Sequence, residues 1–390
     1  MRTTPLQKGL NPAMFLVRNL FETKNLKQTP TRSGFGEGLV EAGKKDKNIV
    51  VLCCDLTEST RADMFKKVFP ERFIQMGIAE QALASIGAGL SMAGKVPFIS
   101  SYAAFSPGRN WEQIKTTIAL QNSNVKIAGA HSGLSVGPDG ATHQMLEDII
   151  LTRAMPNMTV EVPCDAIETR KTAVAGAKFV GPFYFRFARS ATPVFTTEKT
   201  PFKLGRAEVY RFGNDVTLVA AGPLLYEALL AADALSKEHG IECRVINAHS
   251  IKPFDEKTLI AAAKETGAIV TIEEGQTHGG LAGIVCETLA LTTPVPVERV
   301  GAQNQYGESG EPAQVLEAFG LTAPFIALAV VRVLDRKHGV AVSKIPAHMQ
   351  AAEERRIMMR KQIFEEALSR APRKWGGTKP DLQVRSNKKR

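Results

Sequence analysis

Short apolar segments alternate with segments of helical pattern along most of the chain, and this alternation restricts the fold more than any other feature. In the first part of the chain, the apolar segments are residues 49–54, 73–76, 96–100, 125–130, 159–162 and 183–187. The helical segments are residues 35–43, 60–69, 79–93, 109–121, 146–153 and 165–178. Continuously apolar strands that alternate with helices are typical of a mostly parallel sheet covered on both faces. The sequence therefore predicts an α/β fold.

A second series of the same kind follows a segment with two prolines at residues 192–203. Its strands are expected at 216–220, 243–247 and 269–273, and its helices at 224–239, 256–266 and 280–291. A chain of 390 residues is long enough for two or three domains. We predict two parallel-sheet, three-layer domains at residues 31–192 and 204–335, with a linker at 193–203. The second domain shows no obvious catalytic set, and dimer packing is its expected role.

Both ends of the chain differ from this pattern. Residues 1–30 form a polar arm with one apolar patch between Met14 and Phe21, which we expect to dock on the body or on a partner. Residues 336–390 hold 15 Lys and Arg against 5 Asp and Glu, so the net charge of +10 belongs to this tail and the body is neutral. We expect a helix at 349–369 and a disordered basic segment at 373–390, as a solvated extension. Because the body is neutral, nucleic-acid binding is not expected. The alternative is that the basic tail binds RNA.

The five cysteines are scattered and have no metal-binding spacing. They are Cys53, Cys54, Cys164, Cys243 and Cys286, most of them with apolar neighbours. Such a set is typical of reduced core thiols, which predicts a cytoplasmic protein. The longest apolar runs look shorter than a membrane span, and no signal peptide precedes the first domain, so no membrane association is expected.

Polar residues that are suited to catalysis or ligand binding follow the predicted strands at one edge of the first sheet. They are the segment 55–59, Glu80, Ser101, Tyr102, His131 and Arg189. In open parallel sheets, ligands bind at the carboxyl ends of the strands. Glu80 lies in the first turn of a helix rich in small residues from Ala79 to Gly89, a composition that suggests close approach by another helix. Taken alone, a glutamate at this place only complements the helix dipole.

The glycine-rich segment from His131 to His143 carries the most specific pattern. Two histidines and Asp139 within one loop are hard to explain as packing. A zinc site is the competing explanation, but no further ligand is close in the sequence. The ordered set of Glu80, Tyr102 and this loop resembles the transketolase family, specifically its C-terminal half, from about residue 31 to about residue 335.

The resemblance implies thiamine diphosphate as the cofactor and a two-carbon transfer between sugar phosphates as the reaction. Glu80 matches the family glutamate that hydrogen-bonds the cofactor's pyrimidine ring, and Asp55, Tyr102 and Phe105 are expected beside that ring. Simple core filling is the alternative explanation for the two aromatic residues. His131 and His143 match catalytic histidines that also contact the substrate. Further substrate contacts are expected from Arg32, Ser59, Asp139 and Arg189, with the arginines suited to phosphate.

The resemblance also implies that a second polypeptide is needed. The family binds the cofactor's diphosphate through a metal ion in an upstream domain with a Gly-Asp-Gly motif, and this chain has no Gly-Asp-Gly. We therefore expect a separate diphosphate-binding subunit that holds Mg²⁺ or Ca²⁺, no metal ligands in this chain, and self-association into an assembly with two copies of each subunit. A deoxyxylulose-phosphate synthase, the β subunit of a 2-oxo acid dehydrogenase and a non-catalytic paralogue stay open as alternatives.

Overall fold

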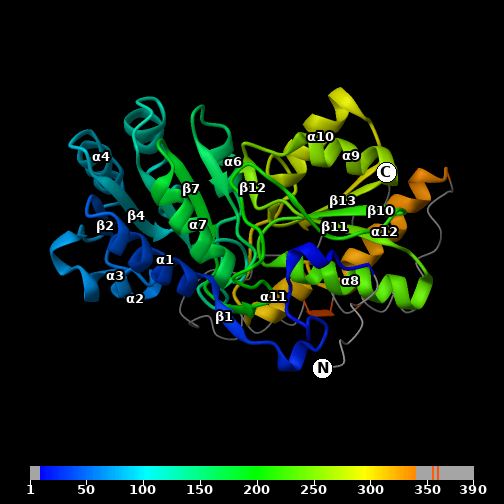
Figure 1. Ribbon diagram of the computed structural model, residues 1–390. Helices are drawn as coiled ribbons and strands as arrows, with labels where there is room; N and C mark the ends of the chain where they lie inside the picture. The colour runs from blue at the N-terminus through cyan, green and yellow to red at the C-terminus, as the bar shows by residue number, and fades with distance from the viewer. Residues whose placement is uncertain (1–8, 340–353, 355–357, 360–390) are drawn as a thin grey trace, which may run out of the picture.

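The computed structural model describes residues 9–339, 354, 358 and 359, and it contains two α/β units, each built on its own sheet (Figure 1). The helix expected at 349–369 and the basic segment at 373–390 lie outside the described residues, apart from these last three positions. Because both sheets are mostly parallel and helices cover their faces, the predicted fold class is confirmed.

The first sheet has seven strands in the order β12-β6-β7-β5-β4-β2-β3. Six of them are parallel, and their carboxyl ends meet at one edge. The seventh, β12, is antiparallel and comes from the second half of the chain. The strands are β2 (Ile49–Cys53), β3 (Phe73–Gln75), β4 (Val96–Tyr102), β5 (Lys126–Ala130), β6 (Thr159–Glu161), β7 (Phe183–Phe187) and β12 (Ser250–Lys252).

Helices cover both faces of this sheet and bury alternate residues of its strands. On one face, Phe35, Phe65 and Phe183 pack between the sheet and helices α1, α3 and α7. On the other face, Leu83 and Ile118 belong to a cluster that continues into the second domain. The helices are α1 (Thr31–Lys45), α2 (Thr57–Thr60), α3 (Asp63–Val68), η3 (Pro70–Arg72), α4 (Glu80–Met92), α5 (Trp111–Gln113), the π-helix η4 (Ile114–Ala119), α6 (Asp148–Arg153) and α7 (Ala166–Lys178).

Three expectations about these helices were wrong. The helix expected at 60–69 is two short helices, because Arg61 has a left-handed backbone (φ 67°) that ends α2. The helix expected at 109–121 is one turn of α5 followed by a π-helix. The close approach to α4 comes from a strand: a Cβ on Gly87 would lie 2.8 Å from the side chain of Ile99 in β4, whereas Gly89 faces open space.

The second sheet has five strands in the order β14-β13-β10-β11-β9, and only β9 is antiparallel. Besides the elements expected, the second domain contains two strands, β9 and β14, and two helices, α11 and α12, that the sequence pattern did not predict. The elements are β9 (Glu208–Arg211), β10 (Val216–Ala220), α8 (Leu224–His239), β11 (Cys243–Asn247), α9 (Glu256–Thr266), β13 (Ile269–Gln276), α10 (Leu281–Thr292), β14 (Val297–Ala302), α11 (Pro312–Ala318) and α12 (Ala323–Lys337).

The stretch Pro312–Lys337 reaches the length and mean hydropathy of a membrane span, contrary to the sequence expectation. More than half of its most apolar 18-residue window, 56%, is buried inside the fold. Phe325, Ile326 and Val330 of α12 belong to the core of the second domain. Its apolar character is therefore accounted for by packing on the second sheet.

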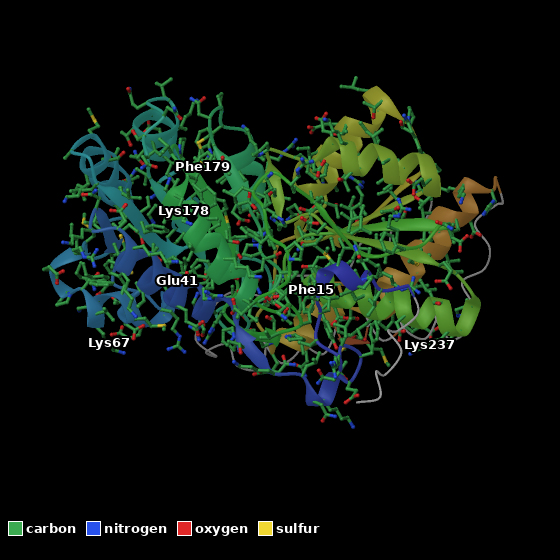
Figure 2. All side chains as sticks on the ribbon, in the orientation of Figure 1. Phe15, Glu41, Lys67, Lys178, Phe179 and Lys237 are labelled. Atoms are coloured by element: carbon green, nitrogen blue, oxygen red, sulfur yellow. The ribbon has the colours of Figure 1, made fainter. Side chains whose placement is uncertain are left out.

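The N-terminal arm lies on the second domain. Met14, Leu20 and Leu26 join that domain's core, and the hydroxyl of Tyr226 donates to the carbonyl of Leu20 at 2.9 Å. Phe15, where the arm passes the middle of the molecule in Figure 2, stays about half exposed. The arm contains η1 (Pro12–Met14), η2 (Thr23–Asn25) and β1 (Gln28–Pro30), and β1 pairs with β8 (Ala191–Pro193).

A buried group of charged residues joins the two domains. Arg186 of β7 lies 3.2 Å from the carboxylate of Asp148 and donates to the carbonyl of Glu274 in β13. Glu273, which precedes Glu274 in β13, accepts the first N–H groups of α10 with its carboxylate. Burial raises the pKa of Glu273 to about 7. These contacts fix the carboxyl end of β13 beside the carboxyl edge of the first sheet.

We expect the arm to stabilise the second domain through Leu20. The Leu20→Ala substitution removes a fully buried side chain and should lower the free energy of unfolding by about 3 kcal/mol. The matched change Phe15→Ala, at an exposed position of the same arm, should cost less than about 1 kcal/mol. Urea unfolding of the two variants measures both. Equal losses would show that the arm's burial does not support the domain.

Candidate active site

Glu80 begins α4, and its carboxylate is buried at the edge of the first sheet, with 2% of the side chain exposed. Ser101, near the end of β4, donates from Oγ to Oε1 at 3.1 Å. Arg109 donates from Nη1 to Oε2 at 2.6 Å. Asn110 donates its side-chain amide to the backbone carbonyl of Glu80 at 2.8 Å. Each carboxylate oxygen therefore has a donor, which compensates for burial of the charge.

Four aromatic rings gather next to this carboxylate. The ring of Tyr102 stacks on that of His131, with centroids 3.9 Å apart, and lies parallel to that of Phe105 at 5.9 Å. The ring of His143 meets Phe105 edge-on at 5.5 Å. The guanidinium of Arg109 lies over Phe105, 4.5 Å from its centroid, and so connects the rings to Glu80. The fold thus brings the predicted Glu80 and these four rings into one group.

His131 directly follows β5 with a left-handed backbone (φ 55°) and is almost fully buried. Burial, followed by the charges of Arg32 and Arg189 and by His143, lowers the pKa of His131 to about 3. The imidazole is therefore neutral at physiological pH. Its Nδ1 has no hydrogen-bond partner among the residues that the structure describes. A buried polar atom without a partner points to a ligand group at this place.

The charges of two arginines, Arg32 and Arg189, act on the histidine, and a third arginine, Arg61, acts on Arg32. Burial lowers the pKa of Arg32, and the charges of Arg61 and Arg189 lower it further. Arg32 donates to the carbonyl of Ser59 at 2.8 Å, and Arg189 lies 3.3 Å from the carboxylate of Asp139. Their mutual repulsion is unfavourable unless an anion joins them, so the group is suited to a phosphate.

The loop from His131 to His143 is held by the second domain. Glu274 of β13 accepts the backbone N–H of Ser135 at 2.6 Å. Gly133 allows this approach, because a Cβ there would lie 2.4 Å from a carboxylate oxygen of Glu274. The amide of Gln144 donates to the carbonyls of Leu134 and Glu308, one in each domain. The second domain thus positions this loop, a role that the sequence analysis did not assign to it.

Asp55 and Ser59 take a smaller part in this arrangement than expected. Asp55 follows β2 with a left-handed backbone (φ 56°), and its backbone N–H donates to the side chain of Gln75. Its exposed carboxylate makes no hydrogen bond or ion pair within residues 9–339. Ser59 is half-buried and contributes its backbone carbonyl, which accepts from Arg32.

The sequence analysis assigned no role to Ser101, Arg61, Arg109 or Asn110. Ser101 was placed at the correct edge of the sheet, but its bond to Glu80 depends on the register of β4 beside α4. Arg109 and Asn110 follow a Pro-Gly turn at 107–108, the one sequence feature that indicates a reversal of the chain toward Glu80. Among the described residues, no group of three or more His, Cys, Asp and Glu could hold a metal ion.

Comparisons with known proteins agree with this geometry. The pattern of the domain described as "Transketolase, pyrimidine binding domain" matches residues 27–194, and that of "Transketolase, C-terminal domain" matches residues 205–326. A "Putative transketolase C-terminal section" from Methanocaldococcus jannaschii is 39% identical over 78% of this chain and 96% of its own length. The chain belongs to the transketolase family.

Two further relatives of this transketolase-family chain are also matched over almost their whole length. An apulose-4-phosphate transketolase subunit from Phocaeicola vulgatus is 39% identical over 74% of this chain and 93% of its own length. The solved structure "Split gene transketolase, inactive beta4 tetramer" is 44% identical, covers 79% of this chain and 99% of that chain, and has a TM-score of 0.74. The chain is thus similar to the C-terminal subunits of split transketolases.

The transketolase family implies thiamine diphosphate, and the residues present fit its aminopyrimidine ring. Glu80 offers a buried carboxylate beside the aromatic faces of Tyr102 and Phe105, which suit a flat heterocycle. The partnerless Nδ1 of His131 lies on the same ring group. A carboxylate, a neutral histidine and a set of cations therefore lie together at one edge of the first sheet, an arrangement suited to a flat heterocycle and an anion.

We predict that His131 stays neutral from pH 8 down to about pH 4. Its pKa is lowered in the folded chain, so the unfolded chain binds more protons below about pH 6.5 and His131 lowers folding stability as the pH falls. NMR of the imidazole resonances, assigned with the His131→Gln variant, measures this directly. A His131 signal that titrates near pH 6.5 would contradict the geometry described.

We predict that Arg109 and Glu80 are energetically coupled. A double-mutant cycle with Arg109→Gln and Glu80→Gln should give a coupling free energy of about 1–3 kcal/mol in urea unfolding, because the lone carboxylate would stay buried without its main donor. The pair of Arg153 and Glu287, whose carboxylate is 59% exposed, serves as the control and should give less than about 1 kcal/mol. Similar values for both pairs would mean that Arg109 makes only a surface contact.

Proposed function

We propose that this chain is the C-terminal subunit of a split, thiamine-diphosphate-dependent transketolase. The complete enzyme transfers a two-carbon glycolaldehyde unit from a ketose phosphate to an aldose phosphate. The observation that carries the proposal is the joining of buried Glu80, the Tyr102–His131 ring stack and the arginine group at one sheet edge. The name of one relative, an apulose-4-phosphate transketolase subunit, supports the same substrate class.

Each side chain has a stated part in the proposed reaction. Thiamine diphosphate, when bound, supplies the carbon nucleophile that takes up and passes on the two-carbon unit. Glu80 holds or releases a proton at the pyrimidine ring, and Arg109 and Ser101 orient its carboxylate. His131 and His143 hydrogen-bond the sugar oxygens, with His131 acting as a neutral group. Asp139 binds a sugar hydroxyl, and Arg32 and Arg189 bind the phosphate.

The remaining half of the cofactor site belongs, in this proposal, to a separate polypeptide. That polypeptide holds the diphosphate through Mg²⁺ or Ca²⁺, for which this chain has no Gly-Asp-Gly motif. The words "C-terminal section" and "subunit" in the names of the relatives support this division. Two copies of each polypeptide then form the active assembly.

The proposal is tested by assaying glycolaldehyde transfer from xylulose 5-phosphate to ribose 5-phosphate with thiamine diphosphate and Mg²⁺. This chain alone should give no turnover, and the chain mixed with the Gly-Asp-Gly polypeptide should be active. Full activity of the chain alone would contradict the split enzyme. Turnover of pyruvate by the mixture, without any of xylulose 5-phosphate, would instead support the synthase or dehydrogenase alternatives.

The exposed face of α4 is the expected docking surface for the partner, because it continues directly from Glu80. Ile86 is 43% exposed there, and Met92 and Ile78 at its two ends are more exposed still. Ile86→Glu should weaken the affinity for the partner at least about tenfold in sedimentation or titration experiments. Leu291→Glu, at an exposed apolar position on α10, is the control and should bind normally. Equal affinities of both variants would move the docking surface elsewhere.

A further inference from the structure

The second domain has a polar groove that the proposed transketolase reaction does not use. Its volume is about 350 Å³, within the range of small-molecule sites. One wall is β14, the edge strand of the second sheet, and the other is α12. Buried Phe319, Phe325 and Leu328 form part of its lining. In Figure 1, α12 lies on the side of the molecule opposite α4, far from the carboxyl edge of the first sheet.

The edge strand presents mainly hydrogen-bond donors to this groove. The carbonyls of Pro296 and Ala302 accept N–H groups from β13, so alternation turns the backbone groups of Val297, Arg299 and Gly301 outward. The outward carbonyl of Val297 already accepts from Arg336, and that of Arg299 accepts from Gln303. The outward N–H groups of Arg299 and Gly301 remain directed away from the sheet, and the carbonyl of Gly301 is the one outward acceptor of this strand to which no described side chain donates.

This pattern argues against an added peptide strand and in favour of an anion. A strand that pairs with an edge needs donors and acceptors in alternation, and two of the acceptors on β14 are occupied by side chains. An anion needs only donors. The occupied carbonyls therefore leave an edge that is complementary to negative oxygen atoms.

The charged side chains that line the groove also favour an anion. Arg332 and Arg336 of α12 line the groove together with one carboxylate, that of Glu298, which pairs with Arg336. The side chain of Arg299 points to the opposite face of the sheet, where it donates to the carbonyl of Thr277, so Arg299 borders the groove through its backbone. Within the part of the chain that the structure describes, Arg332 has neither a hydrogen bond nor an ion pair, and it is half-buried. A half-buried guanidinium without a counter-charge is a ready partner for a phosphate.

We propose that the groove between β14 and α12 is a second anion site, which binds the phosphate group of a small metabolite. Arg332 contacts the phosphate, with Arg336 beside it, and the outward N–H groups of β14 complete its shell. This site shares no residue with the cofactor site, so a test of it does not depend on the proposed transketolase activity.

The experiment is calorimetric titration of the full chain with inorganic phosphate. It uses the Arg189→Gln background, because Arg189 belongs to the active-site arginine group and would add a second binding event. Saturable binding should persist in this background. Adding Arg332→Gln should weaken it about tenfold, and adding Arg336→Gln as well should weaken it further.

The matched control is Arg206→Gln, which removes the same charge from an exposed position of the same domain outside the groove. It should leave phosphate binding unchanged. An equal loss with Arg206→Gln would show that only net charge matters and would overturn the site. Loss of all saturable binding in the Arg189→Gln background would also overturn it, while leaving the active-site arginines as the single phosphate site.

Discussion

Six parallel strands end at one edge of the first sheet, and this convergence makes the candidate site possible. The turns that follow β2 and β5 place Asp55 and His131 in left-handed backbone conformations, which are uncommon for residues with a side chain. Such conformations persist where the surrounding structure over-determines them. Around His131, the surrounding structure is the Tyr102 ring, the β5 ladder and a loop clamped by Glu274. The second domain therefore contributes to the site by fixing the loop.

The electrostatics of the site are arranged for ligands that the chain itself does not supply. Glu80 is buried but satisfied by Ser101 and Arg109, so its burial is compensated in the free chain. His131 is buried and neutral, with a nitrogen that has no partner among the described residues. The positive charges of Arg61 and Arg189 both act unfavourably on the charged form of Arg32. In the proposed reaction, the cofactor ring and an anionic sugar would supply the partners that the histidine and the arginines lack.

The sequence predicts the fold well where apolar residues are continuous and poorly where structure depends on distant contacts. The strands at 49–53, 126–130 and 183–187 are found because each is a mostly apolar or aromatic-rich run between helices. Strand β9 has four residues with a charged residue at each end, and β12 has three residues and pairs with a strand of the other domain. Neither gives a clear local pattern, so periodicity along the sequence does not reveal them.

The same limit applies to the site. Glu80, Tyr102, His131 and Arg189 could be placed at one edge because each follows a strand of a predicted parallel sheet. Arg109 could not, because it lies 29 residues from Glu80 and meets it only through the turns at 103–110. Asp55 had the same sequence position as the others but faces solvent, since the direction of a side chain after a strand depends on the turn.

The most direct test of this account is the activity of the Glu80→Gln chain assembled with the diphosphate-binding partner. Glutamine keeps the size of the side chain and removes its ability to exchange a proton. The account predicts that the complex still forms and that glycolaldehyde transfer falls by at least about 100-fold. Wild-type transfer by a correctly assembled Glu80→Gln complex would contradict the assignment of the buried carboxylate as the group on which the site depends.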